Sequence, residues 1–566
     1  MSIKLLWISS IFCIIGHLAF PQSTYAPLNS DYYYLIDRFQ VLDGDLSKDR
    51  MHSSFKPYSR KSIAGFLDSM AIEMSEKDQA NLTYLQNDNW EYFKNGNENS
   101  KKPFLKHFYK KKSDIVHVDS RDFDLHVKPV IYFSGGRDSQ SASSPYINSR
   151  GIELRGKIDN KISFYTFLSE NQAVFAKYVQ DYSARIGGVP NEGFWKLFGD
   201  NGHDFFTARG YIQFHATRHI GIQFGHDRNF IGNGYRSILL SDYSSPYPFI
   251  KIQTNIWRLQ YTNLFAELTA DAPFTRTGSL GIKEFPKKFM TLHHLSLNVS
   301  NKLNLGIFES VVFHRGDSTG TAIEFNYLNP VIFYSSIEQQ TGSPDNALLG
   351  LDFKWNARKG VSFYGQFILD ELIVSELRAG RGWWGNKYAY QLGGKYFNAF
   401  RISNLDLQTE YNYSRPFTYS HESIFTNYAH YRQPLAHPLG ANFKEWVFIA
   451  RYQPMDRLFL TWKVVKASSG SDPEGQNFGG DVLKSYNTRI DNPRPETDYG
   501  YNTTDGIANN LTFVDFTASY RLKHNLFVDL KHIYRKMDSE NPINNFTSQF
   551  SSLSIRLNIA ARDYSF

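Results

Sequence analysis

The stretch Ser552-Leu-Ser-Ile-Arg-Leu-Asn-Ile559 alternates polar and branched apolar residues without interruption, and Phe566 follows seven residues later. Successive side chains of a strand point to opposite faces, so the four apolar residues share one face, and Arg556 lies on the other with its polar neighbours. An apolar outer face, a charged inner face and an aromatic last residue are typical of the closing strand of a membrane-spanning barrel. A soluble sheet also uses alternation, so the rest of the chain must decide.

The other end of the chain resembles a secretory signal. Lys4 precedes an apolar run from Leu5 to Phe20, and small or polar residues follow up to Ala26. We expect residues 1–25 to form a signal peptide with cleavage near Gln22 or Ala26. The apolar run is too short for a comfortable spanning helix, which needs about 20 residues, and no other segment comes close. Any membrane crossing is therefore expected to use strands.

Composition agrees with this expectation and excludes several kinds of chemistry. Cys13 is the single cysteine and lies in the apolar run, so the mature chain is expected to have no disulfide and no reactive thiolate. Aromatic residues make up 16% of the chain, whereas mean hydropathy is polar at -0.43. This balance favours a barrel with aromatic girdles; a secreted all-β glycan-binding protein or hydrolase is the alternative. The net charge of +7 is a modest excess, and no motif predicts nucleic-acid binding, a metal site or a cofactor.

Residues 26–120 have a helical pattern and predict a small periplasmic helical bundle with a linker. Asn29 and Ser30 are candidate caps of a first helix that ends at Asp43-Gly44. A second helix is predicted to start at Ser59 and a third after Ser75, where Ser-Glu-Lys-Asp resembles a capping box. Three short amphipathic helices bury little surface alone, so we expect them to dock on something larger.

From residue 121 to 566 the period changes to two, and the joints between strands alternate in length. Thr291–Ser300 and Leu303–Phe313, for example, meet at a short turn, whereas residues 314–347 then form a long joint. An opening strand near Asp122–Ser134, eight such pairs and a closing strand near Gln549–Ile559 give about 18 antiparallel strands. Segregation of short turns from long loops is typical of an outer-membrane barrel, with the long loops outside.

Several distinctive blocks lie in the long joints. They are Phe230-Ile-Gly-Asn-Gly-Tyr-Arg-Ser-Ile-Leu-Leu-Ser-Asp-Tyr-Ser-Ser-Pro-Tyr-Pro248, Tyr327-Leu-Asn-Pro-Val-Ile-Phe333, Gly382-Trp-Trp-Gly-Asn-Lys387, Arg415-Pro-Phe-Thr-Tyr-Ser-His421 and Leu435-Ala-His-Pro-Leu-Gly-Ala-Asn442. These blocks resemble the Wzi family of capsule-assembly outer-membrane proteins, and more closely its RemB-like, gliding-motility members from Bacteroidetes. The resemblance implies an 18-stranded barrel with a helical bundle at its periplasmic mouth and a role in holding surface polysaccharide. Ile231 stands where Wzi proteins tend to carry Trp, so glycan preference is not transferred.

Two long joints carry candidate glycan-binding residues. The joint 373–387 holds Arg378, Arg381, Trp383 and Trp384, and indole faces stack on sugars while guanidinium groups bind carboxylates, so it suits an acidic polysaccharide. An interfacial aromatic belt with snorkelling cations explains the same residues equally well. The joint 414–444 adds a second set of candidates: Arg415, Tyr419, His421, His430 and His437.

The three histidines of the second joint have a spacing that matches no metal-binding signature. They remain candidates for pH sensing. We favour an ordered loop that folds into the lumen with its polar groups hydrogen-bonded. Neither joint, nor any carboxylate pair elsewhere, forms a catalytic constellation.

These features predict a non-enzymatic outer-membrane barrel that binds or organises surface exopolysaccharide or adhesins, in contact with outer-membrane lipid. A structural docking subunit of a gliding or secretion machine, bound to other envelope or motility proteins, is one alternative. A diffusion channel is another, since 18 strands enclose enough space for an aqueous pore.

The last residues predict one local irregularity. The apolar face of the closing strand falls on odd numbers, whereas Tyr564 and Phe566 are even. We therefore expect either a bulge or a departure from the sheet within Ala560–Asp563, or a final Phe that points toward the lumen.

Overall fold

The computed structural model describes residues 22–566 except 29–30, 49–50, 94–98, 102, 271–284, 315–324, 334–344 and 493–496. Most of the predicted signal peptide and the predicted caps Asn29 and Ser30 lie outside the described residues.

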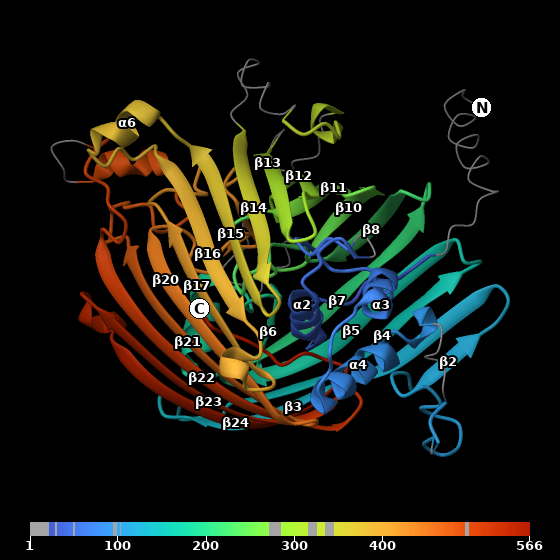
Figure 1. Ribbon diagram of the computed structural model, residues 1–566. Coiled ribbons are helices and arrows are strands. Elements are labelled where there is room, and N and C mark those ends of the chain that lie inside the picture. Colours follow the sequence, from blue (N-terminus) through green and yellow to red (C-terminus); the bar gives the residue numbers. More distant parts are fainter. Residues whose placement is uncertain are drawn as a thin grey trace, which may run out of the picture.

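The wall is a closed antiparallel barrel in which 18 strands of the described chain follow one another around the circumference (Figure 1). These strands are β3 (Phe123–Asp138), β4 (Tyr146–Ile158), β5 (Ile162–Val174), β7 (Gly202–His215), β8 (Ile220–Asp227), β10 (Tyr247–Ile256), β11 (Leu259–Thr269), β12 (Lys287–Asn298), β13 (Leu303–Phe313), β14 (Asn346–Arg358), β15 (Val361–Glu371), β16 (Lys387–Tyr396), β17 (Leu405–Ser414), β20 (Phe443–Met455), β21 (Leu458–Ser471), β22 (Ile507–Lys523), β23 (Leu526–Ser539) and β24 (Phe546–Leu557). The predicted number of strands and their antiparallel order are confirmed.

Shorter strands and helices accompany the wall strands or lie in the joints between them. They are the strands β1 (Phe55–Lys56), β2 (Val116–Asp119), β6 (Lys196–Phe198), β9 (Phe230–Ile231), β18 (Ala429–His430) and β19 (Gln433–Pro434), the helices α5 (Lys177–Ile186) and α6 (Val374–Ala379), and the 3-10 turns η3 (Trp90–Tyr92), η4 (Phe325–Leu328), η6 (Ala399–Arg401), η7 (Tyr486–Asp491) and η8 (Pro542–Asn544). β2 pairs with β3, and β6 pairs with β7.

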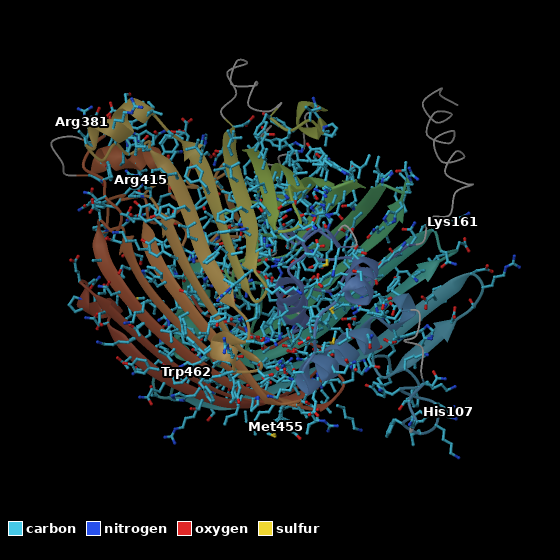
Figure 2. All side chains as sticks on the ribbon, in the orientation of Figure 1. His107, Lys161, Arg381, Arg415, Met455 and Trp462 are labelled. Atoms are coloured by element: carbon cyan, nitrogen blue, oxygen red, sulfur yellow. The ribbon has the colours of Figure 1, made fainter. Side chains whose placement is uncertain are left out.

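The closing strand has the two faces that its alternation predicts. β24 pairs with β23 on one side and with β3 on the other, which closes the barrel. Leu553 and Ile555 are 59% and 41% exposed on the outside, whereas Ser554 and Arg556 are buried toward the lumen. Apolar side chains cover the outer wall elsewhere too, including Trp462 (Figure 2), so lipid is the solvent that this surface suits.

Three N-terminal helices form the predicted bundle: α2 (Tyr32–Asp43), α3 (Arg60–Ser69) and α4 (Glu76–Asp88). The side chains of Ser59 and Ser75 accept the backbone N–H groups that start α3 and α4, as a cap should. Gly44 ends α2 in the left-handed conformation. No helix in the described ranges is long and apolar enough to cross a membrane.

The bundle lies in the mouth of the barrel where the short turns gather, at the opposite end from α6 (Figure 1). Arg38 of α2 has no exposed side-chain surface and is ion-paired with Asp78 of α4 and with Asp406 of the wall. Two further contacts reach the turns: Leu46 N donates to Asn301 O at 2.6 Å, and Tyr84 Oη donates to Asn525 Oδ1 at 2.5 Å. The helices therefore occupy this mouth of the lumen.

Two long joints fold inward at the other end. Ile238, Leu239 and Leu240 have no exposed surface and pack with residues of the 414–444 joint. Their neighbours on the wall are inward-facing apolar residues, among them Leu264 and Leu292. This half of the lumen has a hydrophobic core instead of a water-filled interior, because the loops cover the inner wall.

The chain leaves the wall after Leu557, where β24 ends and Asn558 has a positive φ of 53°. The following tail runs inside the barrel: Arg562 donates to Asn171 Oδ1 at 2.7 Å, and Phe566 packs on Tyr182 with ring centroids 4.1 Å apart. Phe566 is 6% exposed, and its carbonyl accepts a hydrogen bond from Arg535 at 3.0 Å. The chain departs from the sheet at Asn558, before the predicted Ala560–Asp563, and Phe566 lies in the lumen, as the second alternative predicted.

Candidate functional site

The loop that carries the tandem tryptophans docks on another long loop. Trp384 N donates to Asp498 O at 3.0 Å, and Tyr501 N donates to Gly382 O at 2.9 Å. Gly382 has a φ of +70°, which a residue with a side chain would adopt only under strain. Two joints far apart in sequence thus form one surface at the end of the barrel where the long loops lie.

Aromatic rings and cations gather on this surface. We call the set of Arg381, Trp383, Trp384, Tyr486, Arg489 and Tyr499 the rim cluster. The Trp384 ring is covered by the Arg489 guanidinium, whose Cζ lies 3.8 Å from the ring centroid, and Tyr486 packs 4.9 Å away. Trp383 is half-buried and rests over Gly385, where a Cβ would approach its ring to within 2.5 Å. Both indoles are half-buried, and the contacts of Trp384 hold the two loops together.

The charges of the rim cluster are held in defined positions. Arg381 lies 3.0 Å from Glu376, donates to Tyr499 Oη at 2.9 Å and stacks on the Tyr499 ring at 4.1 Å (Figure 2). Arg489 pairs with Asp498 at 2.8 Å. Arg378 is exposed on α6. The guanidinium groups of Arg381 and Arg489 are thus pre-oriented beside aromatic faces, which is the chemistry expected for binding an acidic sugar.

The candidates of the 414–444 joint serve its packing. Arg415 donates to the carbonyl oxygens of Asn386 at 2.8 Å, Trp383 at 3.2 Å and Tyr501 at 3.3 Å, so it fastens the rim loops from beneath (Figure 2). Tyr419 is 1% exposed and donates its hydroxyl to Ile238 O at 2.7 Å. Both side chains hold loops inside the barrel.

The three histidines of this joint are buried separately and each is hydrogen-bonded. His421 contacts Thr426 Oγ1 at 2.8 Å, His430 contacts Pro246 O at 3.2 Å, and His437 contacts Glu445 Oε2 at 2.8 Å. Burial lowers the pKa of His421 to about 4 and the pKa of His430 to about 3. Burial also lowers the pKa of His437, despite Glu445. The three rings are neutral near pH 7, and the favoured expectation of an ordered, inward-folded loop agrees with the structure.

A cavity of about 610 Å³ remains inside the lumen between the bundle, the inward-folded loops and the C-terminal tail. Tyrosines and cations line it, among them Tyr33, Arg209, Arg228 and Arg451. Arg228 donates to Asp242 O at 2.8 Å, but its Nε has no hydrogen-bond partner in the described part of the chain. The volume lies within the range of small-molecule sites.

Tyr486, Arg489 and Tyr499 were not predicted as site residues. They come from the joint after β21, whose sequence shows no strand-like alternation and no motif that marks its partner loop. Aromatic residues are no more frequent in this joint than in the whole chain, so nothing in the sequence marked these three residues.

Comparisons with known proteins identify a protein family and solved structures that this chain resembles. The family model described as capsule assembly protein Wzi matches residues 132–530. The chain belongs to this family. Among solved structures, the outer-membrane protein Wzi of Escherichia coli, described as a carbohydrate-binding β-barrel involved in group 1 capsule assembly, is similar with a TM-score of 0.55 and 14% identity over 95% of this chain and 100% of that chain.

More distant similarity extends to other barrels. OprD of Pseudomonas aeruginosa gives a TM-score of 0.42 at 8% identity over 76% of this chain and 94% of its own. OccAB2 of Acinetobacter baumannii gives 0.42 at 7% identity over 78% of this chain and 99% of its own. No protein of curated function matches the sequence.

Proposed function

We propose that this Wzi-family barrel lies in the outer membrane and binds or organises surface polysaccharide without catalysing a reaction. The bundle would face the periplasm and the long loops the cell surface. Family membership and the apolar outer wall support the location. The carbohydrate binding described for the Escherichia coli Wzi supports the class of ligand.

The rim cluster is the observation that carries this proposal. Trp383 offers a half-buried indole, and Arg381 and Tyr499 lie in the same set with their orientation fixed by hydrogen bonds. An indole face binds the apolar face of a sugar ring, and a guanidinium group binds a carboxylate through two parallel hydrogen bonds. Uronic acids or other acidic sugars present both features, so an acidic polysaccharide is the proposed ligand.

Affinity electrophoresis in gels that contain an acidic or a neutral polysaccharide tests the proposal. The acidic polymer is expected to retard the wild-type protein, and Trp383→Ala is expected to weaken binding about tenfold, or about 1.4 kcal/mol. Trp462→Ala is the matched control, because that indole is 56% exposed on the outer wall. Equal retardation of both variants would remove the rim cluster from the proposal.

The packing of the lumen supports a binding role over a diffusion channel. The bundle occupies one mouth and the inward-folded loops occupy the other half. We therefore expect no stable single-channel conductance in a planar bilayer. Steady conductance in the wild-type protein would favour the channel alternative.

Membership of the RemB-like, gliding-motility branch stays a prediction from the sequence blocks, as does contact with other envelope or motility proteins. Capture of envelope proteins from cross-linked cells, together with an absence of glycan retardation, would favour a docking subunit over a polysaccharide-binding barrel.

A further inference from the structure

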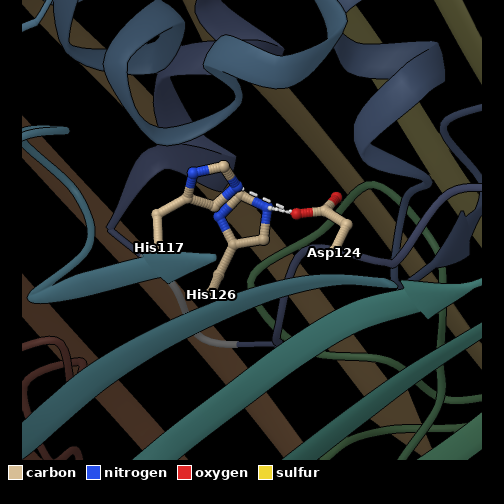
Figure 3. A group of neighbouring side chains, drawn as sticks. All are labelled: His117, Asp124 and His126. Carbon is tan, nitrogen blue, oxygen red and sulfur yellow. Dashed lines mark hydrogen bonds and ion pairs between the residues drawn. The ribbon is translucent and has the colours of Figure 1, made fainter. Parts of the chain in front are cut away.

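Two histidines and an aspartate meet beside the linker between the bundle and the barrel. His117 of β2 and His126 of β3 are direct partners across the strand pair, and Asp124 lies two residues before His126. Directly opposed residues of a strand pair and residues two apart on one strand share a face, so the register places all three on one face. Figure 3 shows both imidazole rings and the carboxylate turned toward one another.

The donor atoms of this cluster are close enough to share one ion. One ligand atom from each residue lies within 4.8 Å of the other two. His117 Nε2 lies 2.9 Å and His126 Nε2 lies 3.3 Å from the same oxygen, Asp124 Oδ1. Ligands about 2.1 Å from a tetrahedral zinc ion are separated by roughly 3.4 Å, so only a small adjustment would admit the metal.

A second carboxylate fixes the buried imidazole for metal binding. His126 Nδ1 lies 3.0 Å from Asp114 Oδ2, which also accepts the Trp90 indole N–H at 3.0 Å and the Ser113 hydroxyl at 2.9 Å. Donation from Nδ1 leaves the lone pair of Nε2 directed at the cluster. The His126 side chain is 1% exposed, and within the described residues its Nε2 has no close polar partner besides the 3.3 Å contact with Asp124 Oδ1. A carboxylate that holds the far nitrogen of an imidazole is a recurring feature of zinc sites.

The surroundings leave one side of the cluster open. The side chains of His117 and Asp124 are 15% and 18% exposed, so an ion and a fourth ligand such as water have access. Of the nearby cations, Arg155 is ion-paired with Glu91, and Lys157 Nζ lies 3.8 Å from Asp124 Oδ2, not from the Oδ1 that the two imidazoles share.

We propose that His117, Asp124 and His126 bind one borderline divalent metal ion such as Zn²⁺, with Asp114 as the positioning carboxylate. Two imidazole nitrogens and one carboxylate oxygen favour zinc and its neighbours over magnesium or calcium, which prefer oxygen ligands. The ion would pin β2 and the linker to the first strand of the wall. Trp90 packs 4.8 Å from His117 and 5.5 Å from His126, so the same ion would also secure the end of the bundle.

Zinc titration of the detergent-solubilised full chain tests the proposal, after removal of metal with EDTA and with a chromophoric chelator as competitor. One equivalent is expected to bind to the wild-type protein, and His117→Ala and Asp124→Asn are expected to lose it. Asp114→Asn is expected to weaken binding 10- to 100-fold, as outer-sphere changes do. His219→Ala is the matched control, because His219 lies in the separate turn between β7 and β8.

Cobalt substitution gives a second readout that does not depend on variants. Co²⁺ bound at this site is expected to produce the visible absorption of a four-coordinate ion and to quench Trp90, and Trp90→Phe is expected to lose that quenching but not the absorption. Wild-type protein that retains no zinc, or His117→Ala that binds it as tightly as His219→Ala, would overturn the proposal and leave a hydrogen-bonded His–Asp cluster.

Discussion

Arg38 is the residue whose loss is expected to release the bundle most directly. Its guanidinium has no exposed surface and bridges Asp78 in the bundle and Asp406 in the wall, with a further hydrogen bond of 2.8 Å to Asn398 Oδ1. Arg38→Met fills much of the volume but leaves two buried carboxylates uncompensated. Breaking one side of a buried ion pair costs about 3 kcal/mol or more, so the undocked fraction should rise roughly a hundredfold.

The cysteine content of the chain offers a direct assay. Cys13 lies in the predicted signal peptide, so Asn81→Cys would introduce the single thiol of the mature protein. Asn81 is fully buried where α4 meets Gln453 of the wall, so a maleimide reaches this position only after undocking. When docking is fast relative to labelling, the labelling rate follows the undocked population.

Arg38→Met in the Asn81→Cys background is therefore expected to be labelled roughly a hundred times faster than the background alone. Lys61→Met is the matched control, because that cation is exposed on α3. Equal labelling rates for the two methionine variants would refute the view that the Arg38 ion pairs hold the bundle in the mouth.

Three further perturbations follow from the same structure. Burial lowers the pKa of His421 to about 4 and that of His430 to about 3, both below the ordinary 6.5. The unfolded chain therefore binds protons more readily, and the stability that is present above pH 6.5 is lost as the pH falls from 6.5 toward 4. At pH 5 each histidine lowers the free energy of unfolding by about 2 kcal/mol. Hydrogen exchange of the 415–442 loop should therefore be faster at pH 5 than at pH 7.5, and this acceleration should be smaller in His430→Gln. Phe566→Ala empties a site that is 6% exposed and should cost about 3 kcal/mol in urea unfolding. Leu553→Lys places a charge on the outer wall and should cost about 2 to 4 kcal/mol in a lipid bilayer.

Each of these three expectations has a contrary outcome. Exchange of the loop that is equal at both pH values, after correction for intrinsic rates, would show that the histidines titrate normally. An unchanged urea midpoint for Phe566→Ala would place the tail outside the cooperative structure. Equal stability of Leu553→Lys and Ser554→Lys would contradict the assignment of the two faces of β24.

The wall and the caps were predictable because each depends on local chemistry. Lipid outside and a polar inner face impose the alternation of Leu553 and Ile555, and Ser59 and Ser75 cap helices through their own side chains. Strand ends were less predictable. β7 begins at Gly202, eight residues before the predicted Gly210, because the adjacent Phe205 and Phe206 interrupt the alternation on which the prediction relied, although one is buried and the other exposed.

The contents of the lumen depend on contacts that a single sequence does not display. Alternation tells which face Leu264 and Leu292 occupy, but not that Leu239 and Leu240 pack against them. The His117 cluster was missed for a related reason. The predicted opening strand began near Asp122 and omitted β2, so the strand that supplies His117 had no place in the pattern.

The tail in the lumen has a consequence for the stability of the seam that closes the barrel. Residues 22–28 and 559–566 both lie against the inner wall, so the two ends of the described chain are enclosed by the strands between them. β24 completes the cylinder by joining β3, and the tail turns from this strand into the lumen. Pairing of β24 with β3 and packing of Phe566 on Tyr182 therefore enclose the same segment from two sides. Opening of the seam between β24 and β3 would expose the tail, so the stability of this seam is coupled to the aromatic pocket around Phe566.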